Sequence, residues 1–497
     1  MAESWVNYAE RIGSDLHLEL SGPGSRRAVL IAALRDAVRS GRLAPGTRLP
    51  PYRSLAADLG VARNTVADAY AELVAEGWLT ARQGSGTHVA ERILPLHSTT
   101  ERTQPLHPAV APKAPGAHPR ARAPRDARLR PTRHDLRQGT PDVSAFPRSA
   151  WLASYRRALH QAPNEVFGPG DPAGRPELRA ALAAYLARAR GVRTDPNRIV
   201  VCSGFAHALR LLFGAGGRQV LRGPLAVEAY GLPFHRELLA AEGVRTVPLP
   251  LDEHGARVDR LTRERAVLLT PAHQFPTGGP LHAERRAAVV DWARARGAVV
   301  LEDDYDGEFR YDRKPVGALQ SLDPERVILI GSVSKSLSPA VRLGWMVLPE
   351  RYVGDVLAAK GEREAWASVP DQLALADLIV SGAYDRHVRR MRQRYRGRRD
   401  RLVAALAERA PHIEVSGVAA GLHAVLRLPP GTERSAVEAA VRQGVALDGL
   451  AEFRHPDTDM PAHDGLVVGY ATPSEHAYGA ALEALCGALA PGGTRVS

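Results

Sequence analysis

A chain of 497 residues is too long for one ordinary hydrophobic core, so two or three domains are expected. Its composition, with 44% hydrophobic and 24% charged residues, is ordinary for a globular protein, and a net charge of +12 is compatible with an anionic partner. Two cysteines without metal-ligand spacing argue against a disulfide framework and a metal site. No stretch approaches the ~20 apolar residues of a membrane-spanning helix, and the N-terminus lacks the apolar segment of a signal peptide, so we expect a cytoplasmic protein.

Residues 16–90 show helical periods that are broken by turn signals, which indicates a small separate domain. The expected helices cover residues 26–40, 52–59 and 63–76. Residues 78–89 then alternate between apolar and polar side chains and turn at a Gly-Ser-Gly sequence, which predicts a two-stranded wing. The segment as a whole predicts a winged helix–turn–helix.

A helix–turn–helix places the N-terminal end of its second helix in the major groove of DNA. In this chain that end carries short or forked polar side chains, which suit contacts with bases and phosphates. The residues concerned are Ala62, Arg63, Asn64 and Thr65. Arg53 and Arg82 are expected to add contacts with the DNA backbone, and the glycines of the wing allow a close approach to the minor groove.

This stretch resembles the GntR family of winged-helix repressors, through LPPYRSLAADLGVARNTV, EGWL and GSGT. The resemblance implies DNA contacts by Arg53, Arg63, Asn64, Thr65, Gln83 and Gly84. Pro51 stands where the family usually has a small polar residue. The alternative role for such a three-helix module is contact with another protein.

Residues 91–133 are rich in proline, arginine and alanine and show little apolar periodicity. Such a segment cannot bury enough surface to offset the entropy of ordering it, so we expect an extended linker. From residue 134 to residue 495, short Val/Ile/Leu runs alternate with long helical patterns. The clearest runs are 198–204, 265–271, 297–304 and 326–332. Strands this apolar, separated by helices, predict an α/β fold with a mostly parallel sheet covered on both faces.

Lys335 lies in a Ser/Gly-rich loop that follows one of these strands. An amine in such a position can condense with an aldehyde to form a Schiff base. Ser332, Ser334 and Arg342 lie close by in the sequence and supply the hydroxyls and the guanidinium that hold a phosphate. The alternative is that Lys335 is an ordinary surface charge.

Asp303 and Tyr305 lie two residues apart at the C-terminal end of an apolar strand, so their side chains share one face. Ligands of α/β sheets bind at such carboxyl ends. A carboxylate can keep the ring nitrogen of pyridoxal 5'-phosphate protonated, and a phenol can reach the ring hydroxyl. Together with Lys335 and Arg342, this pair predicts a pyridoxal phosphate site.

Residues 136–489 resemble fold-type-I aminotransferases, and specifically the MocR-type regulators, which fuse a GntR domain to such a fold. The resemblance is carried by GDPAGRPELRAALAAYLARARGV, TPAHQFPTGG, LEDDYDGEFRY and GSVSKSLSPAVRLGWMVLP. It implies a large mostly parallel sheet with a smaller C-terminal α+β subdomain and a cofactor held on Lys335 as an internal aldimine. It also implies a domain-swapped, head-to-tail homodimer in which the large domain detects the cofactor or a small amine or amino acid.

Several positions depart from the family pattern. Gly204, Phe205 and Ala206 are expected to face the phosphate, although a glutamine is usual at Ala206. The aromatic residue that stacks on the cofactor ring falls at Leu232, with Tyr230 two positions away as the alternative.

Other departures concern the far side of the expected site. Pro169 replaces a tyrosine that often reaches the partner subunit's cofactor. Phe275 replaces an asparagine, which leaves His273 or Gln274 to contact the ring oxygen. Val467 stands where aminotransferases have the arginine that binds a substrate carboxylate. Loss of this arginine typically removes a few kcal/mol of substrate binding free energy, so we expect at most residual transaminase activity.

These observations favour a pyridoxal phosphate-dependent, DNA-binding transcriptional regulator. One alternative is an active aminotransferase with a DNA-binding appendage, which the loss of the arginine at Val467 disfavours. Another is a DNA-binding protein whose large domain is an empty dimerisation scaffold. The sequence identifies neither the target genes nor the effector.

Overall fold

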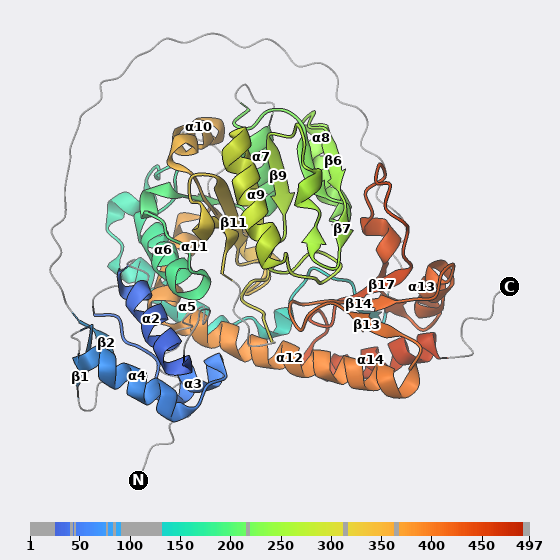
Figure 1. The fold of residues 1–497 in the computed structure, drawn as a ribbon, viewed down its shortest axis with the longest axis horizontal. Helices are drawn as coiled ribbons and strands as arrows, with labels where there is room; N and C mark the ends of the chain where they lie inside the picture. Colours follow the sequence, from blue (N-terminus) through green and yellow to red (C-terminus); the bar gives the residue numbers. More distant parts are fainter. Residues whose placement is uncertain are drawn as a thin grey trace, which may run out of the picture.

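The computed structural model describes residues 25–39, 43, 46–75, 78–82, 86–90, 132–214, 219–311, 317–361 and 367–490. Figure 1 shows a small helical unit at the N-terminal end and a larger α/β body. The expected linker, residues 91–133, lies almost entirely outside the described residues, so the three domain boundaries stay predictions. No helix in the described ranges is long and apolar enough to cross a membrane.

The N-terminal unit contains the three predicted helices, and their ends agree with the expected ones to within one residue. They are α2 (Arg26–Arg39), α3 (Tyr52–Leu59) and α4 (Arg63–Ala75). The strands of the wing, β1 (Leu79–Arg82) and β2 (Gly86–Val89), pair in an antiparallel register. Leu30, Val66 and Leu73 are buried where the helices meet, and the Tyr70 hydroxyl donates to the Pro50 carbonyl at 2.9 Å. This buried bond fixes α4 against the turn that precedes α3.

The large sheet has seven strands in the order β4-β12-β11-β10-β9-β5-β6. Their bounds are β4 (Ile199–Cys202), β12 (Gly344–Val347), β11 (Val327–Ser332), β10 (Val299–Asp304), β9 (Ala266–Leu269), β5 (Leu225–Glu228) and β6 (Thr246–Leu249). All neighbouring pairs are parallel except those that β12 makes with β11 and β4. Every residue of β4 and all but Asp303 of β10 are buried, as expected for strands that are covered on both faces.

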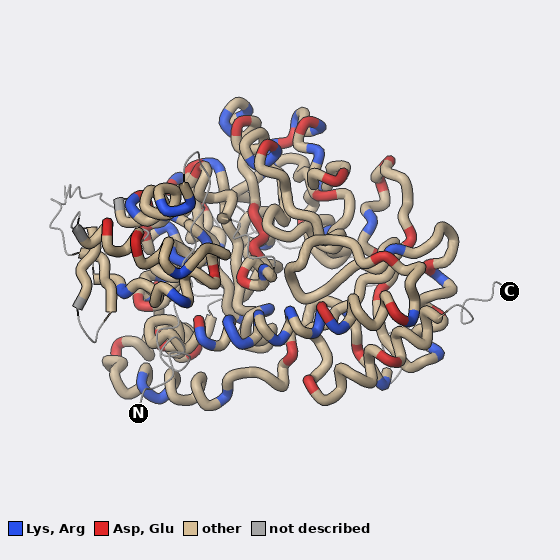
Figure 2. The backbone as a smooth tube through the Cα atoms, turned by 60° about the horizontal axis from the view of Figure 1, so that its bottom comes forward, with Lys and Arg blue, Asp and Glu red and all other residues tan. Residues whose placement is uncertain are grey.

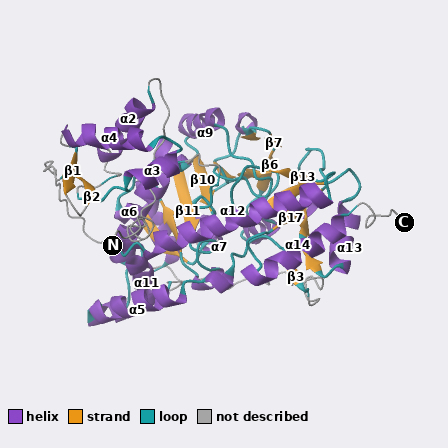
Figure 3. Ribbon diagram, turned by 90° about the horizontal axis from the view of Figure 1, so that it is seen from below, coloured by secondary structure: helices purple, strands orange, loops and turns teal. Residues whose placement is uncertain are grey.

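Helices cover both faces of this sheet, as Figure 3 shows. One face packs on α7 (Phe205–Phe213), α8 (Pro233–Ala241) and α10 (Glu350–Lys360). The other packs on α6 (Pro176–Arg190), α9 (Ala283–Arg296) and α11 (Val369–Val380), with α5 (Arg148–Gln161) outside α11. Successive residues alternate between the two faces: Val200 packs toward α7, and Val201 packs toward α6.

The long helix α12 (Ala383–Arg409) connects the large sheet to a smaller α+β subdomain (Figure 1). Its antiparallel sheet has the order β13-β14-β17-β16, with bounds β13 (Glu414–Ser416), β14 (Ala424–Arg427), β17 (Gly465–Val468) and β16 (Asp448–Gly449). The helices α13 (Glu433–Arg442) and α14 (Glu475–Leu489) complete it. A short strand at the start of the body, β3 (His134–Asp135), pairs with β15 (Val445–Ala446), so both ends of the body meet in this subdomain.

Basic residues lie along much of α12, as Figure 2 shows in blue. One of them, Arg398, is buried and forms an ion pair of 2.9 Å with the buried Asp142 and another of 2.9 Å with Glu475 on α14. It also donates to the carbonyls of Ala471 and Pro473 at 3.0 and 2.7 Å. A guanidinium with this many partners offsets the cost of its burial and ties three distant segments together.

Three glycines let the backbones of β4, β11 and β12 approach closely at the carboxyl end of the large sheet. A Cβ atom on Gly344 would lie 2.7 Å from the Cα of Gly204 and 2.9 Å from the carbonyl oxygen of Gly331. Gly204, which precedes α7, has φ 106° and ψ −177°, a conformation that side chains with a Cβ rarely adopt. The backbone turn at the start of α7 is therefore held against the sheet by direct main-chain contact.

We predict that Gly344→Ala destabilises the large domain by about 1–3 kcal/mol, because backbone atoms cannot yield to the added methyl group. Gly354→Ala is the control, since Gly354 is exposed within α10 and no atom lies within 4 Å of the place that its added methyl group would take. That exchange should leave the protein as stable or stabilise it by about 0.5–1 kcal/mol. Urea unfolding monitored by tryptophan fluorescence measures both, and equal midpoints for the two variants would contradict the packing argument.

Candidate functional site

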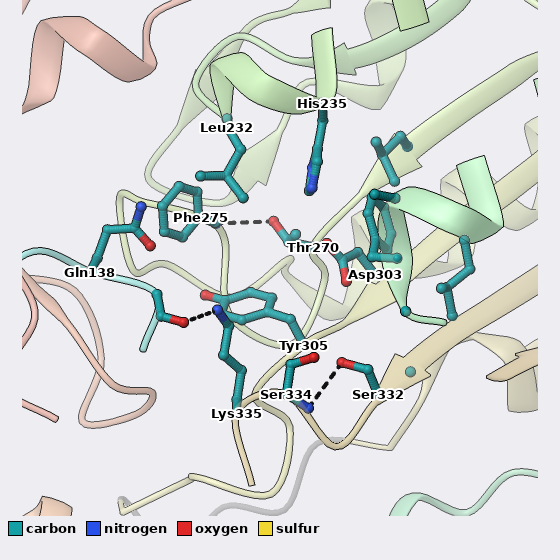
Figure 4. A pocket seen from close by; sticks show the side chains of 18 of the residues that line it. Gln138, Leu232, His235, Thr270, Phe275, Asp303, Tyr305, Ser332, Ser334 and Lys335 are labelled. Carbon is teal, nitrogen blue, oxygen red and sulfur yellow. Dashed lines mark hydrogen bonds between the residues drawn. The ribbon is translucent and has the colours of Figure 1, made fainter. Parts of the chain in front are cut away.

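A cavity of about 270 Å³ opens at the carboxyl ends of β9, β10 and β11 (Figure 4). This is the edge of an α/β sheet at which ligands usually bind. Nine of the residues predicted from the sequence for cofactor binding line it: Gly204, Phe205, Ala206, Asp303, Tyr305, Ser332, Ser334, Lys335 and Arg342. Residues from three separate stretches of the sequence are thus brought to one place.

Lys335 follows β11 and extends its amine into this cavity, beside Tyr305 (Figure 4). Its Nζ donates to the carbonyl oxygen of Gly139. Burial lowers the pKa of the amine, and the nearby charge of Asp303 opposes this shift in part. A lowered pKa leaves more of the amine neutral, which is the form that attacks a carbonyl carbon.

Asp303 lies on β10 with its carboxyl group in the same cavity. Burial, and next the adjacent Asp304, raise the pKa of this carboxyl well above its usual value. Within the described ranges, no group donates a hydrogen bond to it. An orphaned carboxyl in a buried cavity fits a ligand that brings its own N–H donor, such as a protonated pyridine ring.

Tyr305 is held by the segment that follows β9. Its hydroxyl donates to the carbonyl oxygen of His273 at 3.1 Å and lies 3.0 Å from Nδ1 of the same residue. That Nδ1 is also 2.7 Å from the Asp306 carboxylate. Burial, and next Asp306, raise the pKa of Tyr305 well above its ordinary value, so the group stays a phenol that can donate or accept.

The opposite end of the cavity is suited to an anion. Gly204, Phe205 and Ala206 form the N-terminal end of α7, where backbone N–H groups and the helix dipole favour negative charge. Ser332 and Arg342 line the same end. Arg342 has φ 55°, the one positive φ found among non-glycine residues in the described ranges. Such strained backbone is typical of functional sites, and Arg342 is one of the residues that line the cavity.

Two residues predicted for the cofactor do not line the cavity. Tyr230 is buried with Phe275 and Val467, and Leu232 faces the cavity instead. The Gln274 side chain donates to the carbonyls of Tyr230 and Phe275 at 3.0 and 2.6 Å, so its amide serves the backbone. Its neighbour His273 is paired with Asp306 and is likewise absent from the lining.

The position of the expected carboxylate-binding arginine is apolar. Val467 is fully buried and pairs with Val425 across β14 and β17. A cationic side chain does line the cavity nearby, namely Arg236 of α8. Its guanidinium, however, donates to the carbonyls of Gly231, Phe453 and Arg454 at 2.7, 3.2 and 3.2 Å. These bonds fix α8 to the small subdomain and occupy three of the five N–H donors of the guanidinium.

Sequence reasoning missed several lining residues, among them Gln138, Gly139, Glu228, His235, Thr270 and His423. Glu228 and Thr270 could have been predicted from the sequence, because each lies at or just after the C-terminal end of an apolar strand. The Glu228 carboxylate accepts bonds from the backbone and hydroxyl of Thr270 at 3.1 and 2.6 Å. Burial nevertheless raises the pKa of Glu228 to about 7.

The predicted DNA-binding end of α4 is open to solvent. Ala62, Arg63 and Asn64 are exposed, and Thr65 is half-buried with its N–H bonded to the Ala62 carbonyl at 3.0 Å. Arg53 is exposed on α3. Gln83 and Gly84 lie outside the described residues, and for Arg82 the structure describes the backbone of β1 alone.

Pro51, which departs from the GntR pattern, lies directly before α3. Pro51 occupies the N-cap of α3, and no side chain caps the helix there. A small polar residue would accept a bond from one of the free N–H groups of the first turn. Those N–H groups next to Arg53 therefore remain available to an anion such as a DNA phosphate.

Comparison with known proteins agrees with both halves of this picture. Residues 27–89 match the family of bacterial regulatory proteins called the gntR family, and residues 135–460 match the family aminotransferase class I and II. The probable rhizopine catabolism regulatory protein MocR of Rhizobium meliloti is 35% identical over 451 residues, which cover 89% of each chain. The HTH-type pyridoxine biosynthesis transcriptional regulator PdxR of Corynebacterium glutamicum is 31% identical over 91% of this chain and 93% of its own.

Among solved structures, an archaeal alanine:glyoxylate aminotransferase superposes with a TM-score of 0.64 at 24% identity, over 73% of this chain and 91% of its own. The α-aminoadipate aminotransferase LysN of Thermus thermophilus gives 0.63 at 24% identity, over 74% and 95%. These likenesses confirm the predicted aminotransferase fold.

The fold and the two family matches define a transcriptional regulator with a GntR-type DNA-binding domain and an aminotransferase-like domain. The chain belongs to the MocR-type regulators, since the similarity to MocR and PdxR spans both domains. The prediction of pyridoxal phosphate as cofactor is confirmed at the level of the class I and II aminotransferase family.

We predict that Arg63→Ala weakens binding to the cognate operator and lowers its salt dependence, because one cation near the DNA is lost. Arg442→Ala removes the same charge from an exposed site on α13 and should bind like the parent. Fluorescence anisotropy at several salt concentrations measures both. Parental affinity in Arg63→Ala would show that the recognition end is wrongly placed.

The raised pKa of Glu228 predicts a pH effect on stability. In the folded chain this carboxyl keeps its proton up to about pH 7, against an ordinary value of 4.5. The contribution of Glu228 to the free energy of unfolding is therefore fully present below about pH 4.5. It is lost as the pH rises through 7, which lowers the free energy of unfolding by on the order of 3 kcal/mol.

Glu228→Gln should remove this contribution, so that its unfolding free energy falls less than the parent's between pH 5 and pH 8. Glu237→Gln, at an exposed site on α8, should follow the parent. Urea titrations at the two pH values decide the matter, and parallel pH profiles for the parent and Glu228→Gln would refute the assignment.

Proposed function

We propose that this regulator binds pyridoxal phosphate at Lys335 and that occupancy of the cavity changes its affinity for its operator. The observation that carries the proposal is the meeting of a buried amine, an unpartnered carboxyl and an anion-binding helix end in one cavity. Pyridoxal phosphate supplies an aldehyde that condenses with an amine, and the donors present fit its other groups.

Each side chain has a distinct part in this proposal. Lys335 would supply the amine, whose pKa is lowered by burial, and Asp303 would accept a hydrogen bond from the protonated ring nitrogen. Ser332, Ser334 and the N-terminal end of α7 donate to the phosphate, and Arg342 neutralises its charge. Tyr305 faces the ring hydroxyl.

The cavity favours effectors without a carboxylate. The cations that line it in the described ranges are Lys335, Arg342 and Arg236. The first two serve the cofactor in this proposal, and the third is bonded to three carbonyls. Val467, which replaces the expected arginine, is packed in an apolar cluster and does not line the cavity, so an amino-acid effector would lack that cationic partner and the proposed effector is the cofactor itself or a small amine. The same arrangement argues against sustained transamination.

We also propose that the regulator works as a homodimer, domain-swapped and head-to-tail. Membership of the MocR-type family supports this, and a two-fold dimer presents two recognition helices to two half-sites of an operator.

Lys335→Ala tests the proposal directly. The parent should acquire a visible absorption band on addition of pyridoxal phosphate, and its operator affinity should change at the same cofactor concentration. Lys335→Ala should remain colourless and bind the operator with one affinity at all cofactor concentrations, equal to that of the cofactor-free parent. Absorbance and anisotropy titrations measure the two effects, and a parent that stays colourless would refute the proposal.

A further inference from the structure

The cavity lacks the flat side chain that normally covers a cofactor ring at position 232. Leu232, at the N-cap of α8, lines the cavity, but a branched aliphatic side chain cannot stack on a ring. Aromatic ring pairs are stabilised by stacking beyond the apolar area that they bury. A chain that binds a pyridine ring without such a partner would give up part of its affinity.

His235 follows Leu232 by three residues, in the first turn of α8, and also lines the cavity. Its backbone N–H donates to the Leu232 carbonyl at 3.1 Å, so both residues belong to the first turn of the helix. Figure 4 shows the imidazole pointing from α8 into the cavity, on the side where Thr270 and Asp303 lie. A flat ring thus enters the cavity close to the group expected to hold the pyridine nitrogen.

The imidazole of His235 packs against an aromatic ring, and its nitrogens make no hydrogen bond within the described residues. The Phe205 ring, at the start of α7, lies 4.6 Å from it between centroids, with 36° between the planes. In the part of the chain that the structure describes, neither ring nitrogen makes a hydrogen bond. Burial, and next the charges of Lys335 and Arg236, lower the pKa of His235 to about 3. The ring is therefore neutral at physiological pH and does not repel a protonated pyridine.

We propose that His235 is the ring-stacking residue of this regulator, its imidazole covering one face of the pyridine ring in place of the aromatic residue absent at Leu232. The inference rests on cofactor binding at Lys335, as proposed above. Phe205 positions the imidazole from the phosphate end of the cavity.

The test is a titration of the full-length protein with pyridoxal phosphate, followed by visible absorbance and by the circular dichroism of the same band. His235→Ala should weaken cofactor binding about tenfold and reduce the dichroism, because the ring is less fixed. His235→Phe keeps a flat ring and should bind within about twofold of the parent. Glu237→Ala, on the exposed side of α8, should bind like the parent.

Two further variants separate stacking from simple filling of space. His235→Leu keeps apolar bulk without a flat ring and should lose affinity as His235→Ala does. Adding Leu232→Tyr to His235→Ala should recover affinity and dichroism, since a ring returns at the usual position. Urea midpoints within error of the parent show that each variant is folded.

The outcomes discriminate between the two proposals. If the parent binds the cofactor and His235→Ala matches it in affinity and dichroism, the stacking role is overturned. Equal losses in His235→Phe and His235→Ala also overturn it, because a flat ring alone would then not suffice. If the parent itself fails to bind, the cofactor site at Lys335 is refuted.

Discussion

The burial of an amine and a carboxyl in one cavity is the constraint on which the site depends. Lys335 and Asp303 both lose solvation there, so the pKa of the amine falls and that of the carboxyl rises. Each group is thereby pushed toward its neutral form, and the carboxyl has no donor within the described residues. A ligand that brings a cationic ring N–H and an aldehyde satisfies both groups, so its binding stabilises the folded domain.

The scaffold positions these groups through backbone geometry. Parallel strands β10 and β11 are neighbours, so the residues at and after their carboxyl ends emerge side by side. Main-chain contact between Gly204 and Gly344 holds the start of α7 against the same edge, and Arg342, with its left-handed backbone, lines the cavity there. The anion-binding end is thus built largely from backbone conformation, which explains why it tolerates Phe205 and Ala206 in a loop where polar side chains are usual.

The sequence predicted those parts of the molecule that depend on short-range patterns. The helices of the N-terminal unit and the apolar strands follow from periodicity, and Lys335, Asp303 and Arg342 follow from motifs next to strand ends. Tyr230 and Leu232 could not be told apart, because the turn before α8 directs its side chains according to packing against the small subdomain. The prediction that Gln274 contacts the cofactor failed for a similar reason. Its amide donates to two backbone carbonyls, and no local sequence pattern indicates these bonds.

The apolar side chain that stands in place of the expected substrate clamp is part of a packed core. Val467 belongs to a cluster with Phe275, Val425 and Leu450. An arginine restored there would be buried against these apolar side chains, across from Asp448, its register partner on β16. The loss of the substrate clamp is therefore embedded in the surrounding core. The cavity retains the amine, the carboxyl and the phosphate cradle. The arginine of α8 that lines it donates to two carbonyls of the small subdomain, so α8 and that subdomain are coupled by direct hydrogen bonds.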